Sequence, residues 1–192
     1  MALPQMVEHY TYDDYMSWTD NARCELIDGF VYMMSPAPGR LHQKASGGLY
    51  RQLANFLEGK SCEVYAAPFD VRIDPEGADD TVVQPDITVI CDESILTDHG
   101  ASGTPTVVME IISPSSARID RIAKLEVYRR TGVPEYWIVD PDRQTVEVHL
   151  LKDGEYITRS YVKNEPVPVT HLPGLSIDLN KVFAPLKALS TS

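Results

Sequence analysis

Three short apolar segments constrain the fold of this chain most strongly. They span residues 81–91, 106–112 and 135–140, and each is rich in β-branched or aromatic side chains. Only Pro85-Asp86 interrupts the first of them. A nearly continuous apolar run of this length predicts a strand covered on both faces, whereas a half-exposed strand alternates apolar and polar residues. We therefore expect a central sheet that is flanked on both sides.

The segments before these strands carry helix and hairpin signals. Residues 11–14 resemble a capping box with Asp in place of Glu, which predicts a short helix to about residue 20. Asp28-Gly29 lies between two apolar stretches and predicts a hairpin over residues 25–34, because both turn residues accept a positive φ. Apolar residues at helical spacing over 41–57 predict an amphipathic helix.

Further strands are expected on both sides of the central segments. The first spans residues 63–73, where Pro68 indicates an edge position or a bulge. The polar residues between the first two apolar runs, with His99, Gly100 and Gly103, predict a loop. After the third run, the sequence predicts a C-terminal pair of strands, 145–151 and 156–162, joined by a turn at Asp153-Gly154.

The composition suits one globular domain. The chain has 192 residues, of which 43% are hydrophobic and 23% charged, close to ordinary globular usage. We expect a single domain over residues 1–192 with its core at about 10–180. The order of the elements predicts an α/β (α+β) fold with a mixed central β-sheet flanked by helices, an N-terminal hairpin and a C-terminal β-meander.

The charge balance limits the kinds of partner. The formal net charge is −11, which disfavours binding nucleic acid or an anionic membrane through bulk charge alone. Two stretches depart from this balance, because residues 40–57 and 118–130 each carry a net charge of +3. They could form a local phosphate-binding face, or they could simply be solvated helix faces.

The cysteines and the N-terminal sequence bear on the compartment. Cys24, Cys62 and Cys91 are an odd number with no Cys-x-x-Cys pair. We therefore expect neither a disulfide framework nor a zinc site, as suits a reducing cytoplasm. The first twenty residues contain four acidic residues and no Lys or Arg, which is unlike a secretory signal. No apolar run approaches the ~18–20 residues that span a membrane, so a cytoplasmic protein is expected.

Glu110 is the most informative single position, because it lies inside an otherwise apolar strand segment. A buried, unpaired carboxylate costs several kcal/mol, so Glu110 needs a cation or strong donors. It could form a structural ion pair at a strand end. Alternatively, it could meet Asp86 from the preceding segment, which is otherwise a turn aspartate, because consecutive strands are often neighbours. Two carboxylates with open positions suit Mg²⁺ and phosphodiester hydrolysis.

A helix is expected from Ser115 or Ser116 to Thr131, with Gly132 as its left-handed stop. One face of this helix carries polar residues at a spacing of four: Asp120, Lys124 and Tyr128. The simplest interpretation is an exposed Asp120–Lys124 pair that contributes at most ~0.5 kcal/mol. In a functional interpretation, Lys124 orients the attacking water and stabilises charge on the phosphate.

These residues form a recognisable constellation. The sequence resembles the Uma-type endonuclease family of the PD-(D/E)XK, restriction-endonuclease-like nuclease superfamily, over about residues 10–180. The motifs are Glu25-Leu-Ile-Asp28-Gly29, His42, Gln84-Pro85-Asp86, Glu110-Ile-Ile-Ser113-Pro114-Ser-Ser116, Asp120-x-x-x-Lys124-x-x-x-Tyr128 and Gly132-Val133-x-Glu135-Tyr136-Trp137-Ile138-Val139-Asp140-Pro141. The resemblance implies a restriction-endonuclease-like fold.

The resemblance also implies a metal site. Asp86 and Glu110 would hold Mg²⁺ or Mn²⁺, with the Ile111 carbonyl nearby. In the general pattern of the superfamily, a lysine follows the glutamate by two residues, but this chain has Ile112 there. The resemblance therefore implies that Lys124, on the following helix, takes over the catalytic role.

Four further residues are candidates for the site. Glu25 resembles an extra N-terminal carboxylate with a catalytic role, although it could be only the first residue of a hairpin. His42 could contact phosphate, or it could be an ordinary solvated histidine. Ser113 and Arg121 are further possible substrate contacts.

We expect a metal-dependent endonuclease that acts on DNA as a homodimer, with no membrane partner. The meander 136–162 is the expected dimer contact, because two sites related by a two-fold axis can reach both strands of a duplex. The alternative is a non-catalytic protein that keeps the nuclease fold as an interaction or nucleic-acid-binding module. A glycosidase-like carboxylate pair is disfavoured, because the expected cleft of exposed aromatic residues is lacking.

Overall fold

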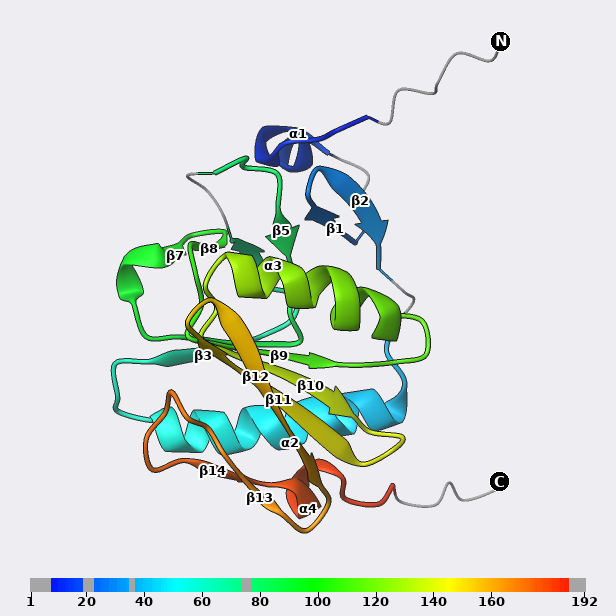
Figure 1. Cartoon of the computed structure of the whole chain (residues 1–192), viewed down its shortest axis with the longest axis vertical. Helices are drawn as coiled ribbons and strands as arrows, with labels where there is room; N and C mark the ends of the chain where they lie inside the picture. Colours follow the sequence, from blue (N-terminus) through cyan, green and yellow to red (C-terminus); the bar gives the residue numbers. More distant parts are fainter. Residues whose placement is uncertain (1–7, 19–22, 35–36, 74–76, 187–192) are drawn as a thin grey trace.

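The computed structural model describes residues 8–18, 23–34, 37–73 and 77–186 (Figure 1). Its central sheet has six strands in the order β12-β11-β10-β9-β6-β3. These strands are β3 (Glu63–Ala66), β6 (Ile87–Ile90), β9 (Val107–Ile111), β10 (Glu135–Asp140), β11 (Thr145–Lys152) and β12 (Glu155–Val162). Strands β9 and β10 are parallel and the other neighbours are antiparallel. The sheet is therefore mixed, as predicted.

A second sheet lies beside the central one and contains the predicted N-terminal hairpin (Figure 1). Its order is β2-β1-β5-β4-β8-β7. The strands are β1 (Cys24–Ile27), β2 (Phe30–Met33), β4 (Asp70–Arg72), β5 (Val82–Val83), β7 (Leu96–Thr97) and β8 (Gly100–Ser102). Asp28 and Gly29 form the hairpin turn with φ of 51° and 75°, and the expected capping box of Thr11 and Asp14 begins helix α1 (Tyr12–Ser17). Both predictions are confirmed.

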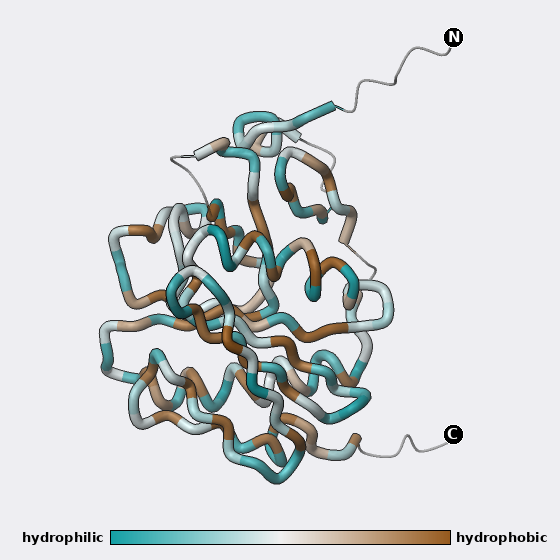
Figure 2. Tube along the Cα trace, viewed as in Figure 1, coloured by the Kyte–Doolittle hydropathy of each residue, from teal (hydrophilic) through white to brown (hydrophobic). Residues whose placement is uncertain are grey.

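Helices cover both faces of the central sheet. Helix α2 (Arg40–Leu57) packs on one face, and the π-helix η2 (Ile119–Lys124) continues into α3 (Leu125–Arg130) on the other. Figure 2 shows hydrophobic residues along the central strands between these layers. The short elements that remain are η1 (Glu93–Ile95), the paired strands β13 (Pro166–Pro168) and β14 (Ser176–Asp178), and α4 (Leu179–Val182).

The alternation of side chains along β9 determines where Glu110 points. Val107, Met109 and Ile111 belong to the core beneath α2, whereas Val108 belongs to the core beneath α3. Because successive side chains of a strand point to opposite faces, Glu110 shares the face of Val108. It therefore faces the helix that carries Lys124.

Two predicted segments differ from the structure. The strand expected over 63–73 is two strands in two different sheets, with Pro68, which has no N–H to donate to a strand ladder, between β3 and β4. The loop expected between residues 91 and 106 contains η1, β7 and β8. Strand β8 pairs in parallel with β4, where a Cβ on Gly100 would lie 2.2 Å from the Asp70 carbonyl oxygen. Such short strands depend on partners far away in the sequence, so local pattern does not reveal them.

The expectation of no disulfide is wrong. Cys62 and Cys91 are joined by a disulfide. They flank β3 and β6, whose antiparallel pairing places Glu63 opposite Ile90 and so brings the two cysteines face to face. The number and spacing of the cysteines could not show this pairing. Because a disulfide is present, the cysteines no longer support a reducing compartment. In the described ranges, every helix is too short or too polar to cross a bilayer.

Candidate active site

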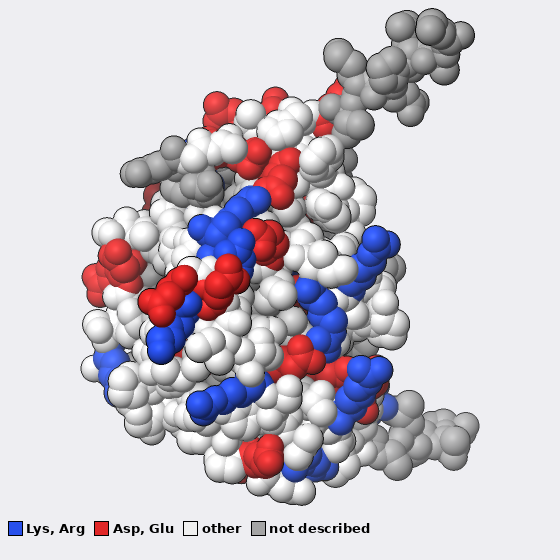
Figure 3. Space-filling view, viewed as in Figure 1, with Lys and Arg blue, Asp and Glu red and all other residues white. Residues whose placement is uncertain are grey.

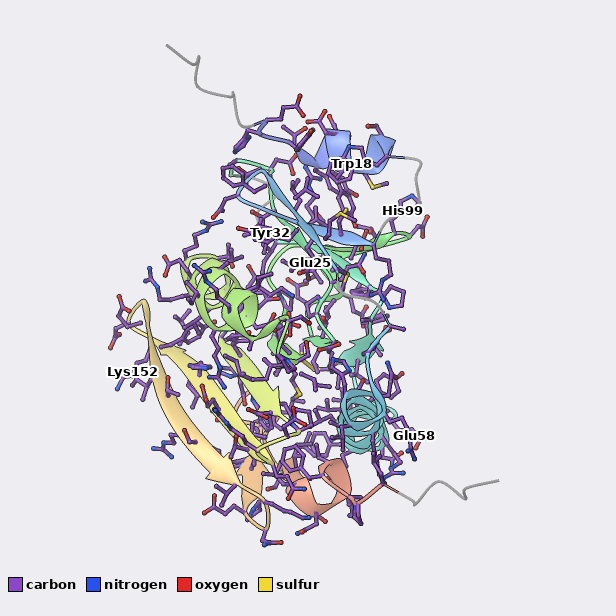
Figure 4. All side chains as sticks on the ribbon, turned by 90° about the vertical axis from the view of Figure 1, so that its right-hand side faces the viewer. Trp18, Glu25, Tyr32, Glu58, His99 and Lys152 are labelled. Carbon is purple, nitrogen blue, oxygen red and sulfur yellow. A yellow bond between two sulfur atoms is a disulfide. The ribbon has the colours of Figure 1, made fainter. Side chains whose placement is uncertain are left out.

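A cavity of about 610 Å³ lies between the two sheets. The β1–β2 hairpin, the first turns of α2, the segment before β6, the end of β9 and the residues up to Lys124 line it. Figure 4 views the molecule from the side of this cavity, with Glu25 and Tyr32 labelled on the hairpin. Most of the residues that the sequence singled out meet here.

Lys124 occupies the centre of a buried cluster of charges. Its Nζ lies 2.7 Å from Glu25 Oε1, 2.9 Å from Glu110 Oε1 and 3.6 Å from Asp120 Oδ1. All four side chains are at most 7% exposed. The hydroxyl of Tyr128 donates a further hydrogen bond of 2.9 Å to Glu110 Oε1. The spacing of four residues on the helix thus brings Asp120, Lys124 and Tyr128 to one point.

The burial of this cluster overturns one interpretation of the sequence. The Asp120–Lys124 pair is not exposed, so the small contribution of a surface pair does not apply to it. Glu110, near the end of β9, does pair with the ammonium of Lys124, as the interpretation of a structural ion pair requires. A single ion pair, however, does not account for the additional carboxylates of Glu25 and Asp120.

Asp86 lies at the more open side of the cluster, with a side chain that is 21% exposed. It directly precedes β6, which is the antiparallel neighbour of β9 with Ile87 opposite Met109. Asp86 Oδ2 accepts a hydrogen bond of 2.7 Å from the backbone N–H of Ile111 and lies 3.2 Å from His42 Nε2. The expected meeting of Asp86 and Glu110 from neighbouring strands is confirmed, and His42 joins them from α2.

The charges of the cluster shift one another's pKa. Burial raises the pKa of Glu110 well above its usual range, and the carboxylates of Asp120, Asp86 and Glu25 raise it further, while Lys124 opposes them. Burial also raises the pKa of Asp120. Burial would lower the pKa of Lys124, but Glu110, Glu25 and Asp120 outweigh it and hold that pKa well above its ordinary value. Lys124 is therefore charged, and its ammonium opposes the repulsion among the acidic groups around it.

The remaining candidates divide into two groups. Ser113 lines the cavity and its hydroxyl is hydrogen-bonded to those of Ser115 and Ser116. Arg121 is not among the residues lining this cavity, because its Nη1 binds both carboxylate oxygens of Glu147 on β11 at 2.6 and 2.7 Å.

Further arginines of the helical segment 118–130 also form ion pairs with acidic side chains. Arg129 pairs with Glu126 and Glu155, and Arg130 pairs with Asp28. On the face shown in Figure 3, basic and acidic side chains are interspersed. Because Arg121, Arg129 and Arg130 are paired with carboxylates, the structure favours the second alternative for the stretch 118–130, a solvated helix face, over a phosphate-binding face.

Two residues of the cavity had no role in the sequence-based prediction. The backbone N–H of Gln84 donates a hydrogen bond of 2.7 Å to Glu25 Oε1, and its side-chain oxygen accepts one of 3.2 Å from Arg23 Nη2. A signal for Arg23 did exist, because it stands two residues before Glu25 and so lies on the same side of an extended segment. Gln84 stands in the Gln-Pro-Asp motif, where only the aspartate was given a role.

Comparisons with known proteins show the family. The family model of Uma2, described as "Putative restriction endonuclease", matches residues 12–180. The chain belongs to the Uma2 family.

Relatives of this Uma2 chain have the same extent. An uncharacterized protein of Synechocystis sp. is 24% identical over 175 residues, which cover 89% of this chain and 90% of that protein. The crystal structure of "a putative nuclease belonging to DUF820" from Anabaena variabilis is 20% identical and covers 91% of this chain and 97% of its own, with a TM-score of 0.73. The structural match shows the nuclease fold.

The donor set of this Uma2 chain fits a hard divalent cation. The cavity is lined by four acidic side chains and one lysine: Glu25, Asp86, Glu110, Asp120 and Lys124. Within the described ranges, no group of three or more His, Cys, Asp or Glu side chains is placed so that it could hold a metal ion. A site of two carboxylates and a carbonyl leaves room for several waters, which Mg²⁺ characteristically retains.

Proposed function

We propose that this chain is a metal-dependent endonuclease that hydrolyses phosphodiester bonds in DNA. One observation carries the proposal: a buried lysine is surrounded by carboxylates at a cavity where Asp86 remains open to solvent. A structural ion pair needs one carboxylate, whereas phosphodiester hydrolysis needs an acidic metal site beside a cation. Membership of the Uma2 family supports this assignment.

Asp86, Glu110 and the carbonyl of Ile111 would hold Mg²⁺ or Mn²⁺. When bound, the metal would neutralise charge on the phosphate and lower the pKa of a bound water. The Ile111 N–H and His42 hold Asp86 in place. Glu25 and Glu110 hold the ammonium of Lys124 at 2.7 and 2.9 Å.

Lys124 has one contact that substrate can replace. Its distance to Asp120 Oδ1 is 3.6 Å, longer than a hydrogen bond. The third N–H of the ammonium is therefore available to a water or to a phosphate oxygen. There it orients the water that attacks phosphorus and stabilises the negative charge that develops on the phosphate.

Metal binding tests the proposal directly. We expect millimolar Mg²⁺ or Mn²⁺ to raise the melting temperature of the wild type, because a cation relieves the repulsion between carboxylates. The Asp86→Asn variant should lose this rise and the cleavage of DNA, while it keeps an acceptor for the Ile111 N–H. Asp142→Asn, an exposed site away from the cavity, should behave as the wild type in both assays. A wild type that neither responds to metal nor cuts DNA would favour the non-catalytic module.

We also propose a homodimer, with its contact on β12. This strand is the edge of the central sheet, and Ile157 and Val162 are each 52% exposed. Within the expected contact surface 136–162 we place the contact on β12, because the side chain of Tyr136 on β10 is completely buried in the core beneath α3. Sedimentation should give twice the 21.4 kDa mass of the chain, and Ile157→Lys should reduce it to the single mass. A wild type that sediments as a monomer at tens of micromolar would contradict the dimer.

A further inference from the structure

One face of the β1–β2 hairpin forms a wall of the cavity. Arg23, Glu25, Tyr32 and Met34 all line it. Glu25 pairs directly with Tyr32, and Arg23 accepts the backbone hydrogen bond of Met34 at 2.9 Å. Side chains of opposed residues in antiparallel strands lie on the same face, so these four project together. Figure 4 shows Glu25 and Tyr32 beside each other on this hairpin.

Two members of this wall have binding capacity that the fold does not use. Arg23 is exposed and donates to the side chain of Gln84, and it forms no ion pair with a carboxylate in the described part of the chain. A guanidinium has five N–H donors, so others remain available. Tyr32 is half-buried, its ring packs in part against the core beneath α3, and its hydroxyl makes no hydrogen bond to any described residue. The wall thus offers a cation and an aromatic ring on either side of Glu25.

The depth of the site limits how a nucleic acid can reach it. Glu110 and Asp120 are each 3% exposed and Glu25 is 5% exposed. A phosphodiester must therefore enter the cavity to reach Lys124. An enzyme that takes a base into a pocket acts on a single strand or extrudes that nucleotide from the duplex. A volume of about 610 Å³ lies in the range of pockets that enclose one small-molecule-sized group.

We propose that this wall binds a single unpaired nucleotide, with Tyr32 against the base and Arg23 on the adjoining phosphate. The preferred substrate is accordingly single-stranded or locally unpaired DNA. The inference rests on the proposed nuclease function and specifies its substrate class. An aromatic ring next to a cation is the combination that single-strand-binding sites use, because every base has a face that can stack. The net charge of −11 also disfavours a duplex, whose binding requires many neutralised phosphates.

The experiment uses the full chain and a labelled 20-nucleotide DNA, either single-stranded or annealed to its complement. Binding is measured by fluorescence anisotropy in Ca²⁺, a cation that takes the same oxygen ligands, and cleavage in Mg²⁺ or Mn²⁺. We expect the single strand to bind at least 10-fold more tightly and to be cut faster. Tyr32→Ala should weaken binding of the single strand by roughly 5- to 150-fold, and Arg23→Gln should also weaken it.

Matched variants outside the cavity serve as controls. Tyr50 on α2 and Arg143 after β10 are exposed and do not line the cavity, so Tyr50→Ala and Arg143→Gln should bind as the wild type. Equal binding and cutting of the duplex, with no effect of Tyr32→Ala, would overturn this inference and leave the nuclease function standing. Binding of the single strand that depends on Tyr32 without any cleavage would support the inference and overturn the nuclease function. Failure to bind or cut either DNA would overturn both.

Discussion

Replacing Lys124 by methionine is expected to slow DNA cleavage by roughly 10²–10³-fold and to lower the free energy of unfolding by about 3–5 kcal/mol at pH 8. The cleavage loss follows from removing the N–H that stabilises charge on the phosphate. The stability loss follows from leaving Glu25, Glu110 and Asp120 buried without the ammonium that now lies 2.7, 2.9 and 3.6 Å away. The affinity for the metal should not fall, because methionine leaves the carboxylates in place and adds no positive charge that would compete with the metal for them.

The stability loss should depend on pH in a defined direction. A carboxyl group with a raised pKa in the folded state destabilises the protein progressively as pH rises from its ordinary pKa toward the raised one. The pKa of Glu110 is already raised, and Lys124 opposes that shift. In the methionine variant the pKa of Glu110 should therefore rise further, so that the pH range over which this residue destabilises the folded protein extends to higher pH. Lys124 itself stays protonated below its ordinary pKa, so its own titration does not contribute between pH 5 and 8.

Urea unfolding in EDTA at pH 5 and pH 8 checks this expectation. The difference between the wild type and Lys124→Met should be larger at pH 8. Lys181→Met removes an exposed lysine that pairs with Asp178 at 3.6 Å, and it should change stability by less than about 0.5 kcal/mol. Cleavage is compared at a temperature at which circular dichroism shows both variants folded. A variant that is as stable and as active as the wild type would show that Lys124 contributes neither to the stability of the fold nor to the cleavage of DNA.

Local pattern predicted the parts of the site that lie on regular elements. The apolar runs gave the buried strands, and neighbouring runs placed Asp86 next to Glu110. The same reasoning failed on Asp120 and Lys124, because a spacing of four residues is identical on a buried and on an exposed helix face. Only the position of the helix over β9 decides between the two.

The contacts that sequence could not supply connect distant segments. Glu25 meets the backbone of Gln84 across 59 residues, and the disulfide of Cys62 and Cys91 closes 29 residues. No local propensity encodes such pairs. They depend on which strands become neighbours, and the break at Pro68 moved the chain from one sheet to the other.

The clearest case is the contrast between two buried glutamates on neighbouring strands. Glu110 on β9 is surrounded by carboxylates and lines the cavity. Glu135 on β10 is completely buried, yet protein donors alone surround its oxygens. Both stand in apolar runs of similar composition, so the sequence does not separate a chemical role from a structural one. The partners of each carboxylate do.

Replacing Glu135 by alanine should therefore lower the free energy of unfolding by about 3–5 kcal/mol without removing the metal response. The change leaves the indole N–H of Trp137 and the backbone N–H groups of Thr170 and His171 without their acceptor, at 2.8, 3.2 and 2.8 Å. Each buried donor left unpaired costs roughly 1–3 kcal/mol. Glu135→Gln keeps one acceptor oxygen, so a smaller loss of about 1–2 kcal/mol is expected.

Comparison with Glu110→Gln separates the two roles. That variant should lose the rise in melting temperature on addition of Mg²⁺ or Mn²⁺, whereas folded Glu135→Gln should keep it, because Glu135 is not among the residues lining the cavity. The exposed Glu58 on the surface provides the control, since Glu58→Ala should stay within about 0.5 kcal/mol of the wild type. If Glu135→Gln lost the metal response while remaining folded, Glu135 would act on the site through β10. The distinction between a structural and a chemical glutamate would then fail.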